Sequence, residues 1–334
     1  MHSCSTHVML CGNPNMIRDT YKCLNKKYSM IKNYQTSPGH ITKRNFLEKL
    51  KIAIAPPVIY LSAAQKYIYG NKNLYLAAQN VDKHISGPFT GETSVYMLQE
   101  FGIKYVIIGH AERRKLHNED YKVITKKFLI LKQYNLIPVL CIGETYKDCK
   151  NKEIKNICIN QINPILDILG IESFREVIIA YEPVWAIGTG KAPSPEYIQN
   201  VHLCIRSYLS QYDLNISKNV LLQYGGSVNS KNVLKILLQP DVNGILLGQA
   251  SIHLKEFLSI LHIAKATNVG GRNTTETTEN IFIILFCSML IKLIAACIKK
   301  LTFWNNDSLC GNSESISCST PLACSNCLEV YFKD

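Results

Sequence analysis

The sequence has few acidic residues for its number of basic ones. Only 25 Asp and Glu accompany 37 Lys and Arg, which gives a formal net charge of +12. An excess of this sign suits nucleic acid, an anionic membrane surface or small anionic substrates. No aromatic residues are interleaved with the lysines of residues 18–51 in a stacking pattern. We therefore expect a solvated basic face there and no nucleic-acid partner.

Three other absences narrow the class of protein. No G-x-G-x-x-G motif opens the first strand–helix unit, which argues against an open dinucleotide-binding sheet. The first dozen residues carry no charged segment followed by a long apolar run, so we expect no secretory signal. Thirteen cysteines are present, but a zinc site needs a framed quartet, and we expect no metal. The tail has a single C-x-x-C among its four cysteines, Cys310, Cys318, Cys324 and Cys327.

From residue 51 to about residue 265, short apolar runs alternate with longer segments of helical periodicity. The runs are apolar throughout, as in strands that are covered on both faces. This alternation predicts parallel strands joined by right-handed crossovers. Seven runs lie at residues 51–55, 74–79, 104–109, 137–143, 177–181, 220–224 and 243–248, and an eighth at residues 7–11 would close a barrel. The predicted fold is α/β, a (β/α)8 TIM barrel with a C-terminal extension.

The two ends of the chain depart from this pattern. Residues 1–50 are rich in Asn and Lys and weakly periodic, so we interpret them as a degenerate first β/α unit or a misassembled N-terminus. Residues 266–334 comprise a polar linker, the apolar segment Ile281–Ile298 and the cysteine-containing tail. That segment carries one charge, Lys292, and is slightly short of the roughly 20 residues that span a bilayer. A membrane anchor and an appended stretch without a packing partner both remain open.

The residues that follow the run at 177–181 are the richest in chemistry. Glu182 stands at the C-terminal end of that predicted strand, where the active sites of such barrels are built. Pro183 and Trp185 come next, followed by Gly188-Thr-Gly190, an amide-rich tip able to fold over a phosphate. A carboxylate beneath such a lid is a stronger base because water is excluded from it. A strand-end salt bridge is the alternative role for Glu182 alone.

Several motifs, in chain order, resemble those of the triosephosphate isomerase family. The resemblance covers about residues 51–265, and the segment at 181–192 looks like the mobile loop of that family. The motifs are Gln79-Asn-Val81, Gly87-Pro-Phe-Thr-Gly-Glu-Thr93, Tyr105-Val-Ile-Ile-Gly-His-Ala-Glu-Arg-Arg114, Cys141-Ile-Gly-Glu144, Tyr224-Gly-Gly-Ser-Val228 and Gly244-Ile-Leu-Leu-Gly248.

The resemblance implies an isomerase that interconverts dihydroxyacetone phosphate and glyceraldehyde 3-phosphate through an enediol, without a cofactor. Glu182 would remove and return a carbon-bound proton, and His110 would polarise the carbonyl oxygen as a neutral imidazole. Glu112 would organise the charges beside the histidine. Substrate binding would fall to Asn13, Gly188, Ser227, Gly248 and Gln249.

The resemblance also implies a homodimer. The loop at residues 87–93 would insert its tip, near Thr90, beside the active site of the partner, and an ordinary surface loop is the alternative. Glycolysis, gluconeogenesis and glycerol catabolism would be its pathways. We expect a cytoplasmic location, with a plastid or another organelle as the alternative.

Three residues depart from the family pattern. Asn15 stands where the family has its substrate-binding lysine, and an asparagine cannot supply the positive charge that holds phosphate and balances an enediolate. Either the barrel is catalytically impaired and serves as a binding or scaffold protein, or the N-terminal sequence is misassembled. Ala111 replaces the serine that usually follows the histidine. Gln249 replaces a glycine, which strains the loop only if that position needs a positive φ.

Overall fold

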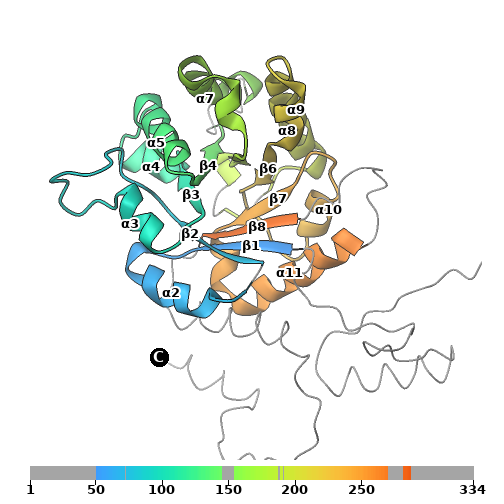
Figure 1. Ribbon diagram of the computed structural model, residues 1–334. Helices are drawn as coiled ribbons and strands as arrows, with labels where there is room; N and C mark the ends of the chain where they lie inside the picture. The colour runs from blue at the N-terminus through green and yellow to red at the C-terminus, as the bar shows by residue number, and fades with distance from the viewer. Residues whose placement is uncertain are drawn as a thin grey trace, which may run out of the picture.

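Eight parallel strands form a closed barrel in chain order, and the helices lie outside the ring (Figure 1). The computed structural model describes residues 50–71, 73–144, 154–186, 189–190, 192–269 and 281–286. The strands are β1 (Leu50–Ala55), β2 (Leu74–Ala78), β3 (Tyr105–Ile108), β4 (Ile137–Ile142), β5 (Ile178–Tyr181), β6 (Leu221–Tyr224), β7 (Gly244–Leu247) and β8 (Ile281–Phe286). Because all eight are parallel, their C-terminal ends meet at one mouth of the barrel.

Four of the described helices begin at a capping serine or aspartate side chain. Ser94, Asp120, Ser194 and Asp213 each accept a hydrogen bond from a backbone N–H in the first turn of the helix that follows. The α-helices are α2 (Leu61–Ile68), α3 (Val95–Glu100), α4 (Ala111–Leu116), α5 (Tyr121–Gln133), α7 (Ile154–Leu169), α8 (Pro195–Ser210), α9 (Leu214–Asn219), α10 (Val233–Leu237) and α11 (Leu254–Val269). Short 3-10 turns are η1 (Val58–Tyr60), η2 (Ile171–Phe174), η3 (Val184–Ala186) and η4 (Gln249–Ile252).

The seven apolar runs of residues 51–248 all form barrel strands, with ends that differ from the prediction by one residue. Their side chains alternate between two buried layers. One layer fills the barrel interior with small residues such as Ala53, Ala77 and Ala180, together with Ile107 and Val139. The other packs between strands and helices. Both faces are therefore covered, which explains the runs without polar alternation.

The strand that closes the barrel differs from the prediction. The run at residues 7–11 lies outside the described residues. The ring is closed by β8, which pairs with β1 from Leu50↔Ile281 to Ala55↔Phe286 and with β7 on its other side. Ile283 packs toward the helices and Ile284 into the barrel interior, and both are fully buried. The barrel thus extends beyond residue 265, into the predicted C-terminal extension.

The membrane-anchor interpretation is wrong for the first six residues of Ile281–Ile298. They form β8, in which Ile283 and Ile284 are fully buried on opposite faces, and the rest of the segment lies outside the described residues. Within the part of the chain that the structure describes, no helix has the length and apolar character needed to cross a bilayer. The four cysteines of the tail also fall outside the described residues.

Candidate active site

Glu182 is held at the barrel mouth between the ends of β4 and β6. It follows β5 directly, and its N–H donates to the carbonyl of Ile142 at the end of β4, with N···O 2.7 Å. Two glycines make room for it. A Cβ at Gly143 would lie 1.9 Å from the Glu182 carbonyl oxygen, and one at Gly225 would lie 2.6 Å from its Cγ. The side chain therefore has little freedom on the sides of β4 and β6.

His110 faces this carboxylate from the neighbouring region of the mouth. It is the N-cap of α4, and its Nδ1 accepts a hydrogen bond from the backbone N–H of Glu112, with N···N 3.3 Å. Its Nε2 lies 3.6 Å from Oε2 of Glu182. Because Nδ1 accepts, the ring proton of the neutral imidazole belongs on Nε2. The structure therefore brings the two predicted residues together, with a donor aimed at the carboxylate side of the site.

The environment of Glu182 favours the protonated carboxyl group more than water does. Its side chain is 2% exposed, and burial raises its pKa above the ordinary carboxyl value. His110, the thiol of Cys141 and the guanidinium of Arg114 oppose that rise, whereas Glu112 adds to it. Oε2 has no hydrogen-bond partner among the described residues. An unpartnered, desolvated carboxylate oxygen is well suited to accepting a proton.

Glu144 anchors the segment that follows Glu182. This buried carboxylate accepts hydrogen bonds from the Tyr181 hydroxyl at 3.0 Å and the Trp185 indole N–H at 2.8 Å, and the Tyr197 hydroxyl lies 3.5 Å away. Burial raises the pKa of Glu144, and these donors oppose the rise. The turn η3, which contains Trp185, is therefore tied to the end of β4.

Ser227 connects this turn to the loop after β6. Its hydroxyl donates to the Ala186 carbonyl at 2.6 Å, and the hydroxyl of Thr189 reaches the same oxygen at 3.2 Å. Ser227 is thus close to the predicted lid. Gly188, Asn13 and Asn15, however, lie outside the described residues.

Gly248 and Gln249 lie at the end of β7, on the same mouth as Glu182. Gln249 is exposed and is the first residue of η4. Its φ is not positive. The glutamine therefore turns outward without straining the loop. Ala111, the other departure, is the first residue of α4 and contributes no hydroxyl.

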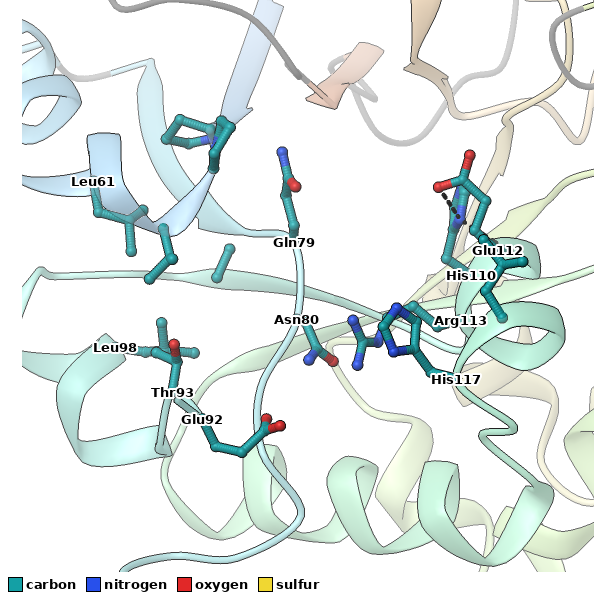
Figure 2. A pocket seen from close by; sticks show the side chains of 15 residues that line it. Leu61, Gln79, Asn80, Glu92, Thr93, Leu98, His110, Glu112, Arg113 and His117 are labelled. Carbon is teal, nitrogen blue, oxygen red and sulfur yellow. Dashed lines mark hydrogen bonds and ion pairs between the residues drawn. The ribbon is translucent and has the colours of Figure 1, made fainter. Parts of the chain in front are cut away.

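His110 also lines a cavity of about 420 Å³ (Figure 2). Gln79, Asn80 and Thr93 line it together with His110 and Glu112. The segment between β2 and α3 extends away from the barrel (Figure 1), and it carries Thr90, which is exposed and does not line this cavity. The structure therefore separates Thr90 from His110 of the same chain.

Ion pairs and a hydrogen bond hold Arg113 and Asn80, two residues that line the cavity. Arg113 Nε lies 2.7 Å and Lys127 Nζ 2.6 Å from Oε1 of Glu119, and Lys127 also donates to Asn80 Oδ1 at 2.8 Å. Glu119 and Lys127 are both buried. One carboxylate is thus shared by two cations, and its pKa is lowered by these partners against the effect of burial.

Sequence reasoning missed four residues that shape the site. Cys141, Glu144 and Gly225 lie inside motifs that were recognised, yet their contacts with Glu182 and its lid depend on which strands become neighbours. Arg114 also lies in a recognised motif, beside His110. Its position among basic neighbours gave no sign that its side chain reaches backbone carbonyls of two segments.

Comparisons with known proteins agree with this architecture. The family profile described as triosephosphate isomerase matches residues 17–264. The chain is 61% identical over 218 residues to the triosephosphate isomerase of Wigglesworthia glossinidia brevipalpis, covering 65% of this chain and 85% of that one. It is 46% identical over 255 residues to that of Buchnera aphidicola subsp. Acyrthosiphon pisum, covering 76% and 94%. The strand β8 lies beyond the matched residues, whereas Glu182 and His110 lie within them. The chain belongs to the triosephosphate isomerase family.

Proposed function

We propose that the chain is a triose-phosphate isomerase that interconverts dihydroxyacetone phosphate and D-glyceraldehyde 3-phosphate through an enediol, with Glu182 as base and His110 as electrophile. Family membership carries the reaction. One observation carries the assignment of roles: His110 Nε2 and Glu182 Oε2 lie 3.6 Å apart at the mouth of the barrel. A base and a hydrogen-bond donor this close can act on adjacent carbon atoms of one small substrate.

Glu182 performs the proton transfer on carbon. Its carboxylate takes a proton from the carbon next to the carbonyl, and the electron pair of that C–H bond moves into the enediolate. The same carboxyl group then returns the proton to the neighbouring carbon. Burial supports this role because it raises the proton affinity of the carboxylate.

His110 stabilises the negative charge that develops on oxygen. Its Nε2–H donates to the substrate carbonyl oxygen, because Nδ1 is already occupied as an acceptor of the Glu112 N–H. Transfer of that proton and its return move hydrogen between the two oxygens of the enediol. A donor held by a helix N-cap needs no reorganisation during the reaction.

We assign phosphate binding to loops after β5, β6 and β7. Ser227 and the backbone of Gly248 and Gln249 come from described loops at the barrel mouth, and Gly188 and Asn13 are proposed to complete the site. Backbone N–H groups and hydroxyls suit a phosphate dianion, and the proposed chemistry uses no cofactor. Asn15 motivates the rival proposal of a catalytically impaired barrel that serves as a binding or scaffold protein.

We propose a homodimer in which the exposed loop of one copy enters the cavity beside His110 of the other. The base of the loop is closed by a hydrogen bond from the N–H of Asp82 to the carbonyl of Thr93 at 2.9 Å. The Phe89 ring stacks on His84 with 3.6 Å between ring centroids, which stiffens the loop. A stiff projecting loop whose tip lies away from the cavity of its own chain favours exchange between copies. Cytoplasm remains our predicted location, with a plastid or another organelle as the alternative.

A coupled assay of the purified full chain tests the proposed function. Wild type should interconvert the two triose phosphates. Glu182→Asp, which retracts the carboxylate by about 1 Å, should lower kcat by about 10²-fold, and Glu182→Gln should lower it further. Glu172→Gln is the matched control, because the Glu172 side chain is 66% exposed and pairs only with Arg175 among the described residues. A wild-type chain without activity would favour the scaffold proposal, and unchanged activity in Glu182→Asp would refute the assigned mechanism.

A further inference from the structure

Arg114 is a half-buried arginine whose hydrogen bonds join the two sides of the candidate active site. From α4, its Nε donates to the carbonyl of Gly109 at 2.6 Å, and its Nη2 donates to the carbonyl of Cys141 at 3.1 Å. Gly109 immediately precedes His110. Cys141 belongs to β4, and its thiol interacts with Glu182. One guanidinium group therefore bridges the turn that carries His110 and the strand that flanks Glu182.

The packing around this bridge is tight. Gly109 has φ +68°, and a Cβ there would lie 2.9 Å from Arg114 Nη2 and 3.2 Å from the Cys141 carbonyl oxygen. The guanidinium therefore occupies the space that a side chain at residue 109 would need. A planar fork with several donors suits two carbonyls on different strands better than a single ammonium group does.

The charge of Arg114 has no ion-pair partner within the described residues. Its hydrogen-bond partners there are carbonyl oxygens. The carboxylates with which it interacts electrostatically are Glu119 and Glu182. Glu119 is already paired with Arg113 and Lys127. A partly buried cation is costly unless a negative charge compensates it, and Glu182 is the other carboxylate that interacts electrostatically with Arg114.

We propose that Arg114 is a positioning residue for the isomerase site, which fixes the His110 turn against β4 and places a positive charge in the surroundings of Glu182. This inference rests on the proposed role of Glu182 as the base. The groups that interact with Glu182 from the surrounding elements are His110 and Glu112 at the start of α4, Arg114 later in that helix, and Cys141 on β4. Burial lowers the pKa of the Arg114 guanidinium, and Cys141, Glu119 and, to the smallest extent, Glu182 raise it. Reciprocally, Arg114 lowers the pKa of Glu182.

Two substitutions separate the charge of Arg114 from its geometry. In Arg114→Met, both are lost, so the acid limb of the kcat/KM profile should move up by about one pH unit, and kcat at its optimum should fall about tenfold. In Arg114→Lys, the charge remains but the fork is lost, so kcat should fall while the acid limb stays within about 0.3 pH units of wild type. KM should change less than about twofold in both, because Arg114 does not contact substrate in the proposed site.

Arg206→Met is the matched control. Arg206 is another half-buried arginine, which pairs with Asp241 at 2.6 Å and donates to backbone carbonyls including that of Val220. Its loss should lower Tm without moving the acid limb. An Arg206→Met variant that shifts the acid limb like Arg114→Met would overturn the proposal, because the shift would then be a general effect of lost stability.

The proposal also fails if folded Arg114→Met keeps the wild-type acid limb and kcat. If Arg114→Met does not fold, Arg114→Lys decides the question. Full kcat in that variant would contradict the bridging role, and a shifted acid limb would contradict the charge role. Infrared titration of the carboxyl band that Glu182→Gln removes gives a readout without substrate. Suppose that the wild-type chain lacks isomerase activity, and that the Glu182 carboxyl group titrates with a higher midpoint in Arg114→Met than in wild type. That result would support this inference while refuting the proposed function.

Discussion

At the scale of single residues, the position of Glu182 depends on two glycines, which have no side chain to fill the space that it occupies. Gly143 lets the backbone of β4 approach the Glu182 carbonyl, and Gly225 leaves the space that the carboxylate itself fills. Gly225 does not have positive φ, so an alanine is compatible with its backbone. The glycine is required by the side chain across from it and not by its own conformation.

Gly225→Ala should therefore displace the base while leaving the fold in place. The new Cβ would lie 2.6 Å from Glu182 Cγ and 2.9 Å from its Oε1, which is closer than packed atoms allow. A shift of about 1 Å should lower kcat by about 10²-fold. Steady-state kinetics and thermal unfolding measure the two effects. A variant with wild-type kcat and wild-type Tm would show that Glu182 tolerates the added methyl group.

The raised pKa of Glu182 predicts how activity depends on pH. Only the ionised carboxylate can take the substrate proton, so kcat/KM should fall as pH decreases through that pKa. Because burial raises the value, the acid limb should lie above the ordinary carboxyl pKa of about 4.3. Rate measurements between pH 4 and pH 9 would locate it, and an acid limb at or below the ordinary value would contradict the burial argument.

The same pKa predicts that the base destabilises the fold. Between the ordinary and the raised pKa, the folded state binds more protons than the unfolded state, so this group's contribution to stability falls as pH rises. Glu182→Gln should therefore unfold at higher urea concentration than wild type at pH 7, with a smaller difference at pH 4. Equal differences at both pH values would rule out this linkage.

Glu182 and His110 could be predicted because each occurs in a local motif at the end of a strand. Gly225 and Arg114 could not be assigned in this way. Their roles depend on a distance of a few ångströms between segments that are far apart in the sequence, or on whether a side chain turns inward. Motif spacing records neither property.

At the scale of elements, β8 is the strand that sequence patterns placed incorrectly. Its six residues form part of a longer apolar segment, and hydropathy does not distinguish a strand buried on both faces from the start of a membrane helix. The seven other strands were predicted because each was flanked by a helical segment. β8 follows a polar linker and lies outside the family match, so neither signal was available.

Ile284→Ala tests whether β8 closes the barrel in solution. The Ile284 side chain is fully buried in the barrel interior, so its truncation should cost about 2–5 kcal/mol of unfolding free energy. Ile168→Ala is the control, because Ile168 on α7 is 63% exposed and should cost less than about 1 kcal/mol. Urea unfolding compares the two variants. Equal, small costs would place residues 281–286 outside the folded barrel.

At the scale of the whole molecule, Thr93 at the end of the projecting loop lines the cavity beside His110, but the tip of the loop, near Thr90, does not. Phe89→Ala removes the ring that stacks on His84 and should leave the loop less ordered. We expect the dissociation constant of the dimer to rise roughly tenfold, which corresponds to a loss of about 1.4 kcal/mol of association free energy. Sedimentation velocity across a concentration series measures this, with Tyr69→Ala, an 88% exposed residue elsewhere, as the control. A wild-type chain that is monomeric at micromolar concentration would remove the basis of the dimer.

Closure by β8 also has a consequence for how the molecule is made. During synthesis, the strands from Leu50 to Leu247 emerge well before Ile281–Phe286, and among the described strands the edges of β1 and β7 then have no partner. Unpaired strand edges invite association between nascent chains. A message cut short before codon 281 would therefore yield a product prone to aggregate, however complete its catalytic residues are.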